Sequence, residues 1–97
     1  MKMLVITYHF EFSEYIEELL DNYAIRDYIR ISQVEAKDCD GKRFGSKVFP
    51  GNSSLVQAQV PEEKLEDILA DLKAFKESRV AHHHLEALVL PVEQRLE

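Results

Sequence analysis

The apolar residues of this chain follow two different spacings, which alternate along the chain in an order that occurs twice. Met3 to Tyr8 is a short apolar run rich in β-branched side chains, typical of a strand buried on both faces. Residues Tyr28 to Glu35 mix β-branched and polar types without helical spacing, which indicates a second strand. Between them, apolar side chains recur at helical spacing: Phe12, Tyr15, Ile16, Leu19, Leu20 and Tyr23. The first half is therefore predicted to be strand, helix, strand.

The second half repeats this order. From Leu55 to Val60 the side chains alternate between two faces, which predicts a third strand. Pro61 suits the first position of a helix, because its missing N–H would be unpaired there anyway. The helical stripe that follows contains Leu65, Ile68, Leu69, Leu72 and Phe75. Leu85 to Leu90 is then a further apolar strand, which we expect Pro91 to stop.

Two β-α-β units with right-handed crossovers fold most simply into one four-stranded antiparallel sheet, with strand order 4-1-3-2 and both helices on one face. The predicted fold class is α+β, a ferredoxin-like βαββαβ sandwich. We expect one domain over residues 1–95 and interpret 96–97 as a remnant of recombinant expression. Since helices cover only one face, Leu55 and other apolar groups on the second face need a cover. We expect oligomerisation through the sheet.

Composition excludes several classes of function. A net charge of −6 argues against binding to a nucleic-acid backbone, which needs a concentrated positive face. Apolar runs such as Ala87 to Val92 are too short to span a membrane, and no cleavage site follows the start, so we expect a cytoplasmic protein without membrane insertion. The lone Cys39 has no internal disulfide partner, and its acidic neighbours disfavour a thiolate. We expect no catalytic nucleophile there.

All three glycines of the chain lie between the second and third predicted strands, in a connection of about 18 residues. Two interpretations stay open: a series of turns that closes a long hairpin, or a loop that binds a ligand or partner. In the second interpretation Arg43 offers a forked donor to an anion, and Lys42 and Lys47 add positive charge. The candidate site residues are Gly41, Lys42, Arg43, Phe44, Gly45, Ser46, Phe49, Gly51 and Asn52.

A histidine triplet precedes the last predicted strand. If it were extended, His82 and His84 would share one face. Because the first and last strands are predicted to be antiparallel neighbours, His9 at the end of the first strand would lie close to the triplet. His9, His82 and His84 thus form a candidate site for zinc, copper or nickel, with a polar helix-to-strand turn as the alternative.

The stretch from Asp40 to Ser53, DGKRFGSKVFPGNS, resembles the corresponding region of PII-like signalling proteins, as does the whole order of elements. The resemblance implies a compact trimer whose sheets face inward, with small ligands in the clefts between subunits. It also implies that this loop changes shape with ligand and contacts a target protein. Residues 77–84 contain no glycine, unlike the phosphate-binding turn of the best-known PII proteins, and the loop lacks the tyrosine that is covalently modified in them.

Three functions remain after this comparison. The first is a trimeric PII-like regulator that binds a small anionic metabolite or nucleotide and signals through residues 36–54 to a target protein that the sequence does not identify. The second is a metal-responsive trimer, similar in architecture to the CutA proteins, that uses the histidines. The third is a small ferredoxin-like enzyme with its site at a subunit interface. Because no phosphate loop, nucleophile elbow or zinc-hydrolase motif is present, we expect a binding protein and not an enzyme. The sequence identifies no cofactor.

Overall fold

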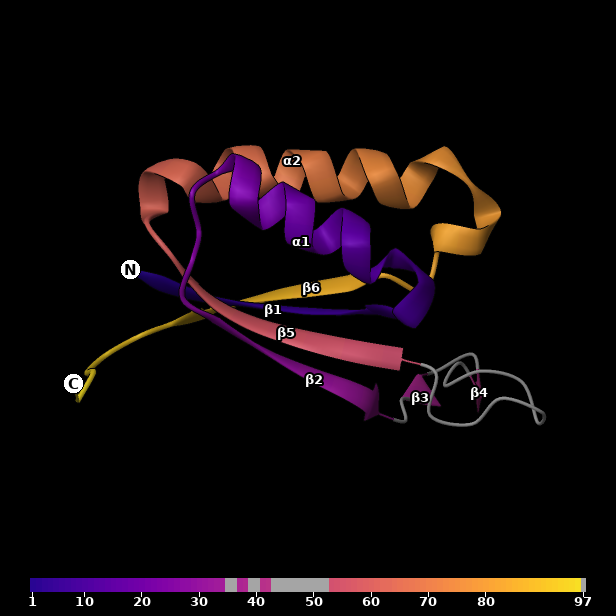
Figure 1. Cartoon of the computed structure of the whole chain (residues 1–97), viewed down its shortest axis with the longest axis horizontal. Coiled ribbons are helices and arrows are strands. Elements are labelled where there is room, and N and C mark those ends of the chain that lie inside the picture. Colours follow the sequence, from indigo (N-terminus) through magenta and orange to yellow (C-terminus); the bar gives the residue numbers. More distant parts are fainter. Residues whose placement is uncertain (35–36, 39–40, 43–52, 97) are drawn as a thin grey trace.

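The computed structural model describes residues 1–34, 37–38, 41–42 and 53–96, and the main body is a four-stranded sheet covered on one face by a layer of helices (Figure 1). The sheet order is β2-β5-β1-β6, with every neighbouring pair antiparallel. This is the predicted order 4-1-3-2, read in reverse. The four strands are β1 (Lys2–His9), β2 (Tyr28–Val34), β5 (Ser53–Val60) and β6 (Glu86–Pro91). The ferredoxin-like α+β fold is confirmed.

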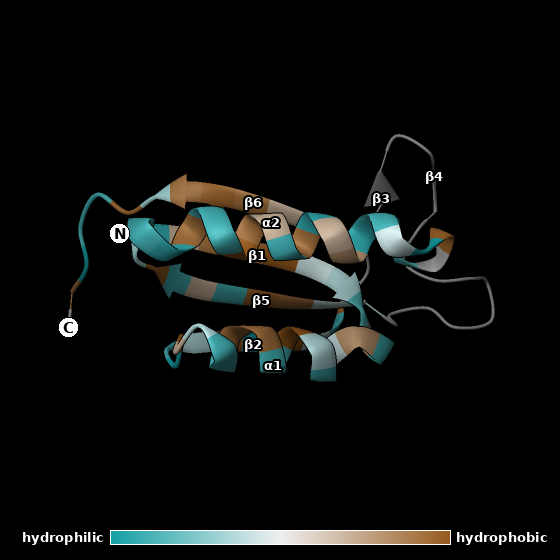
Figure 2. Cartoon of the chain, turned by 90° about the horizontal axis from the view of Figure 1, so that it is seen from above, coloured by the Kyte–Doolittle hydropathy of each residue, from teal (hydrophilic) through white to brown (hydrophobic). Residues whose placement is uncertain are grey.

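Two helices, α1 (Ser13–Asn22) and α2 (Glu62–Ser78), cover one face of the sheet. Seen from above, α2 runs over β1 and α1 runs over β2 (Figure 2). Two short 3-10 helices, η1 (Phe10–Phe12) and η2 (Val80–His82), connect β1 to α1 and α2 toward β6. None of the helices in the described part of the chain is long and apolar enough to cross a membrane.

The core lies between the two layers. Alternate side chains of β1 point at the helices, and Leu4, Ile6 and Tyr8 are almost completely buried. Directly opposite them on β5 lie Ala58, Val56 and Ser54, which are buried as well. The helices contribute Ile16, Leu19, Leu20, Ile68 and Leu72, which belong to the two stripes expected from the sequence.

Helix α1 ends in a Schellman motif. The N–H of Ile25 donates to the carbonyl of Leu20 at 2.8 Å, and the N–H of Ala24 donates to that of Asp21 at 3.0 Å. This geometry puts Ala24 in the left-handed region with φ of 58°, where glycine is the usual residue. The buried Ile25 side chain supplies the apolar contact that accompanies such an ending. The packing of the Ile25 side chain therefore stabilises the unfavourable φ angle of Ala24.

The structure corrects three boundaries and adds one short ladder. Pro61 has an extended backbone and is the N-cap, so α2 begins one residue later. Pro91 does not stop the strand from outside, because it is itself the last residue of β6. Ser53 and Ser54 belong to β5 instead of the loop. The loop also contains a short antiparallel ladder between β3 (Lys37–Asp38) and β4 (Gly41–Lys42).

The second face of the sheet has no helix over it (Figure 1). Strand registers place seven apolar side chains there, several of them exposed: Ile29 is 61%, Leu88 is 54% and Leu90 is 49% exposed. We call this the open face; its apolar members are Met3, Val5, Ile29, Ile31, Leu55, Leu88 and Leu90. A contiguous apolar surface of this kind is typical of an interaction site.

Candidate functional site

One end of the sheet collects most of the residues that the sequence marks as candidates. Strand β1 ends at His9, whose register partner Ser53 begins β5, and Ser53 also pairs with Val34 at the end of β2. The connection 35–52 therefore leaves and re-enters the sheet beside His9. The turn between α2 and β6, which carries the histidine triplet, lies at the same end (Figure 1).

His9 is held by the first turn after β1. Its side chain caps η1, because Nδ1 accepts a hydrogen bond from the N–H of Glu11 at 3.2 Å. In this arrangement the neutral ring carries its proton on Nε2. The carboxylate Oε1 of Glu11 lies 3.4 Å from the same Nδ1, so protonation of the ring would replace the amide contact with an ion pair. In this tautomer Nε2 of His9 is a hydrogen-bond donor, and ligation of a metal would require the ring to lose that proton.

His9 and His84 line one small cavity of about 50 Å³. Such a volume is enough for an ion or a few waters, since about 10 to 15 Å³ of cavity volume suffices for one water. A ligand of nucleotide size would have to lie across its mouth. The other lining residues are Thr7, Tyr8, Phe12, Ser53 and Leu85, none of which carries a charge.

His82 has a different environment. Residues 80–82 form a 3-10 turn instead of a strand, and the His82 side chain is only 9% exposed. Its Nδ1 lies 2.8 Å from the carbonyl oxygen of Phe75 and 3.1 Å from Oγ of Ser78. With Nδ1–H as the donor, the imidazole caps one of the last carbonyls of α2. The ring also stacks on Phe75 at 4.0 Å between centroids.

The predicted three-histidine site is thus divided. His9 and His84 share a cavity, whereas the Nδ1 atom of His82 is engaged at the end of α2. Phe12 packs against both parts, 4.6 Å from the His82 ring and 6.0 Å from the His9 ring. Within the described ranges, no group of three or more His, Cys, Asp or Glu side chains is arranged to hold a metal ion.

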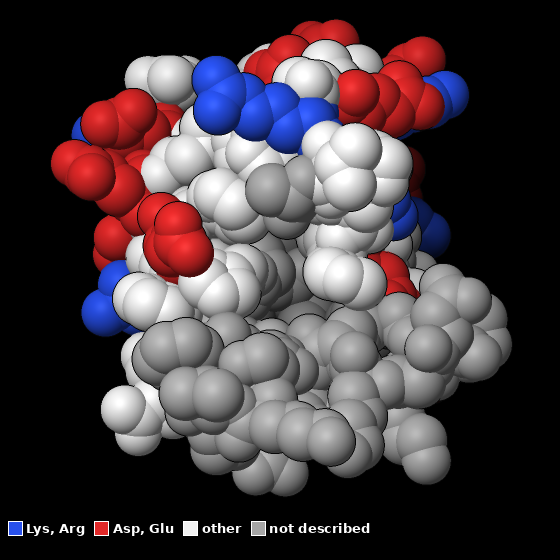
Figure 3. All heavy atoms as spheres, turned by 90° about the vertical axis from the view of Figure 1, so that its right-hand side faces the viewer, with Lys and Arg blue, Asp and Glu red and all other residues white. Residues whose placement is uncertain are grey.

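The loop candidates fall mostly beyond what the structure describes. Gly41 and Lys42 are described in their backbone, as β4. The remaining candidates lie outside the described residues: Arg43, Phe44, Gly45, Ser46, Phe49, Gly51 and Asn52. The adjoining described surface is uncharged at its centre, with acidic side chains gathered above and to the left of it and a long basic side chain across the top (Figure 3). An anion at the uncharged centre of this surface would need hydrogen-bond donors or basic groups from the surrounding segments or from a second copy.

No protein-family model and no curated protein matches this sequence. Solved structures do match it in three dimensions. CPII, a nitrogen regulatory PII-like protein from Thiomonas intermedia K12 bound to ADP, AMP and bicarbonate, superimposes with a TM-score of 0.73. It is 21% identical, and the match covers 92% of this chain and 88% of CPII. The chain has the PII-like fold.

Two further structures share the PII-like fold over similar lengths. A protein from Thermus thermophilus that is described as a PII-like signalling protein matches with a TM-score of 0.60 at 18% identity. The match covers 91% of this chain and 82% of that protein. A DUF3240 family protein from Shewanella baltica matches with a TM-score of 0.72 at 11% identity, and the match covers 99% of this chain and 93% of that protein. The resemblance stated from the loop sequence is therefore confirmed at the level of fold.

Proposed function

We propose that this chain is a PII-like regulatory protein, not an enzyme, that assembles as a trimer and binds a small anionic metabolite or nucleotide in the clefts between subunits. The observation that supports it most strongly is the PII-like fold shared with CPII, a regulatory protein whose structure holds ADP, AMP and bicarbonate. The ligand would sit at the end of the sheet where His9, His84 and the connection 35–52 meet.

The open face supports assembly. Its apolar side chains form adjacent rows across the sheet, such as Ile29, Val5 and Leu88 on three strands, with Gln57 between the first two. Burying a Leu or Ile side chain stabilises by about 1.5 to 3 kcal/mol. Covering several of them would offset the translational and rotational freedom that association removes. A second and third copy of the chain would supply equivalent apolar surfaces.

Light scattering of the full chain tests the assembly. We expect the mass of three copies at micromolar concentration. Leu88→Glu, on the part of the open face that the edge strand β6 contributes, should shift the protein to monomers because three carboxylates would be buried without partners. Ala74→Glu, on the exposed side of α2, is the matched control and should leave the mass of three copies. A stable wild-type monomer would contradict the trimer.

Thermal unfolding with ADP, AMP or bicarbonate tests the ligand. A ligand that binds only the folded state stabilises it by about 2.7 kcal/mol at 100 times its Kd. We expect at least one of the three to raise the unfolding temperature, and a ligand-induced decrease in amide exchange within residues 36–54 would support signalling through the loop. If none stabilises the protein at millimolar concentration, this class of ligand is refuted.

A second candidate function is metal response, because the structure places His9 and His84 at one cavity. Two imidazoles leave a tetrahedral zinc site incomplete, so other ligands would come from solvent or a second copy. We expect zinc or copper to stabilise the wild type, His9→Gln and His84→Gln to abolish the effect, and His83→Gln, an exposed neighbour, to retain it. An unchanged response in the His9 and His84 variants would reject this function.

A further inference from the structure

Phe12 forms one wall of the cavity beside His9. It is the last residue of η1, the short helix that the His9 side chain caps, and it lines the cavity of about 50 Å³ together with His9 and His84. Two other large side chains of the lining, Tyr8 and Leu85, are almost completely buried, whereas Phe12 is partly buried and packs against the core. The Phe12 side chain therefore lies between the cavity and the packed interior.

Aromatic contacts fix the position of the Phe12 ring. It meets Phe75 and His82 edge to face, with centroids 5.4 Å and 4.6 Å away and an interplanar angle of 79° in both pairs. Phe75 stacks in turn on His82 at 4.0 Å and on Tyr15 at 3.9 Å. Because packed side chains occupy fixed rotamers, the Phe12 ring cannot withdraw from the cavity without breaking these contacts.

The volume of the cavity limits what can enter it. About 10 to 15 Å³ of cavity volume holds one water, so this cavity holds about three to five groups of that size. Formate, bicarbonate and acetate are within this limit, whereas pivalate, with three methyl groups next to its carboxylate, exceeds it. His9 and Ser53 pair across β1 and β5, so the sheet side of the cavity is held by strand pairing. The side chain of Phe12 then determines how much room is left.

We propose that Phe12 determines the size of the anion that this cavity admits and restricts it to an oxyanion about as large as bicarbonate or acetate. This inference rests on the proposed function, because it takes the cavity as the place where the anionic ligand binds. An anion with bulk next to its charged group would collide with the fixed Phe12 ring, as extra methylenes do in a packed core. The size limit does not depend on which groups donate hydrogen bonds to the ligand.

The test titrates the full chain with bicarbonate, formate, acetate, isobutyrate and pivalate at fixed pH. The carboxylates share one charged group, and the added methyl groups branch next to it, so they cannot all extend through the mouth of the cavity. Binding is followed by NMR shifts of the imidazole protons of His9 and His84, with sodium chloride at equal ionic strength as the reference. We expect saturable shifts with formate and acetate, and binding of pivalate that is at least about tenfold weaker than that of acetate.

Phe12→Leu removes the ring and keeps an apolar contact with the core. We expect it to bind pivalate about tenfold more tightly than the wild type does, and acetate within about twofold. Phe10→Leu is the matched control and should keep the wild-type preference. The Phe10 ring also lies against His9, at 4.8 Å between centroids, but Phe10 is 53% exposed and is not among the described residues that line the cavity. Phe12→Met replaces the leucine variant if thermal unfolding shows that variant to be unfolded.

The outcomes separate this inference from the proposed function. If wild type and Phe12→Leu depend on anion size in the same way, Phe12 does not set the limit, although the cavity still binds the anion. If Phe10→Leu relaxes the size limit as much as Phe12→Leu, the effect acts through the His9 ring and the inference is wrong. If neither bicarbonate nor any carboxylate shifts the wild-type imidazoles, the anion site in this cavity is refuted and the inference with it.

Discussion

His82 offers the sharpest test of how the turn before β6 is held. The imidazole stacks nearly parallel on Phe75, with an interplanar angle of 8°, and meets the edge of Phe12 at 79°. Its Nδ1 caps the carbonyl of Phe75, which also accepts a hydrogen bond from Oγ of Ser78 at 2.7 Å. Two substitutions divide these contributions: His82→Phe keeps a ring of similar shape without the donor, and His82→Ala removes both.

The magnitudes follow from these contacts. In His82→Phe the carbonyl of Phe75 keeps Ser78 as a donor, so no buried group is left unpaired. We expect a loss of about 1 kcal/mol in the free energy of unfolding, the net value of one hydrogen bond. His82→Ala also removes two aromatic contacts and a buried ring, so we expect a loss of roughly 3 kcal/mol.

Urea unfolding at a fixed protomer concentration measures both values, because the apparent stability of an oligomer depends on concentration. His83→Ala, at the exposed neighbouring imidazole, is the control and should stay within about 0.5 kcal/mol of wild type. A loss in His82→Ala no larger than in His83→Ala would refute the packing described for this turn. Equal losses in both His82 variants would show that the hydrogen bond, not the ring contact, carries the stability.

Three further predictions concern the helix layer and the core. Ala24→Gly should raise the free energy of unfolding by about 1 kcal/mol in urea unfolding, because Ala24 has φ of 58°; a loss would contradict the left-handed ending. The hydrogen bond from Tyr23 to Asp71, 2.6 Å long, raises the pKa of Tyr23 to about 12, so its stabilisation is present below pH 10 and is lost as pH rises through about 12. Asp71→Asn should lower that pKa toward 10, as carbon NMR of the tyrosine rings would show, and an unchanged pKa would reject the bond. Burial raises the pKa of Tyr8, and its hydroxyl, although near Ser13, makes no hydrogen bond of good geometry among the described residues. Tyr8→Phe should therefore leave calorimetric stability unchanged or raise it by about 1 kcal/mol.

The fold could be predicted because spacing and topology agree. Segments with the two-residue spacing of strands and segments with the three-to-four-residue spacing of helices alternate along the chain, in an order that occurs twice. Right-handed crossovers then leave one simple strand order for the sheet. The boundaries were less predictable, since the preference of proline for the first helical position pointed to Pro61, whereas its extended ψ of 143° makes it the N-cap, without a side-chain hydrogen bond. Pro91 can be the last residue of β6 because β6 is an edge strand. On such a strand the N–H that proline lacks need not be required for pairing with a neighbouring strand.

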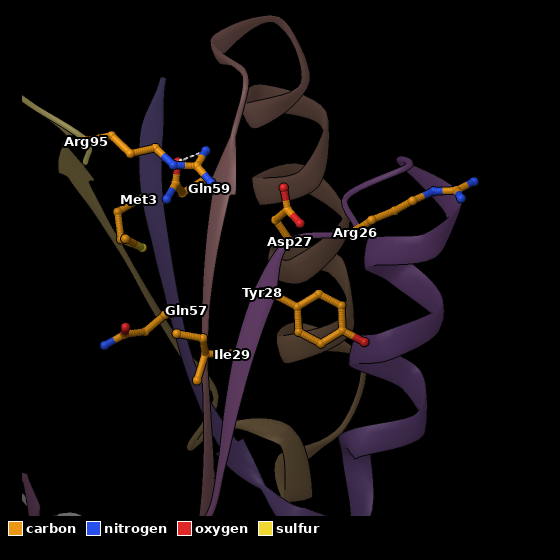
Figure 4. A pocket seen from close by; sticks show the side chains of 8 residues that line it. All are labelled: Met3, Arg26, Asp27, Tyr28, Ile29, Gln57, Gln59 and Arg95. Carbon is orange, nitrogen blue, oxygen red and sulfur yellow. Dashed lines mark hydrogen bonds between the residues drawn. The ribbon is translucent and has the colours of Figure 1, made fainter. Parts of the chain in front are cut away.

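The candidate site was predictable only in part. That His9 approaches His84 follows from the antiparallel pairing of β1 with β6, which the sequence indicates. That His82 lies apart from His9 and His84 does not follow from the sequence, because it depends on a 3-10 turn and on a ring contact with Phe12, which is distant in sequence. The hydrogen bond between Arg95 and Gln59 had no sequence signal at all (Figure 4). Gln57 and Gln59 have the spacing of an ordinary polar strand face, and Arg95 reaches Gln59 only through the path of the tail.

The turn before β6 explains how a PII-like fold can lack a glycine-rich turn at this position. An imidazole cap and a ring stack hold this turn, so it needs neither backbone freedom nor a bound phosphate to be stable. The same construction orients His84 toward the cavity beside His9. Within this described turn, recognition of an anion would rest on imidazole N–H groups and not on a nest of backbone amides. Fewer donors fixed by the backbone favour a small anion over a triphosphate, which is why bicarbonate is the most informative of the three ligands to test first.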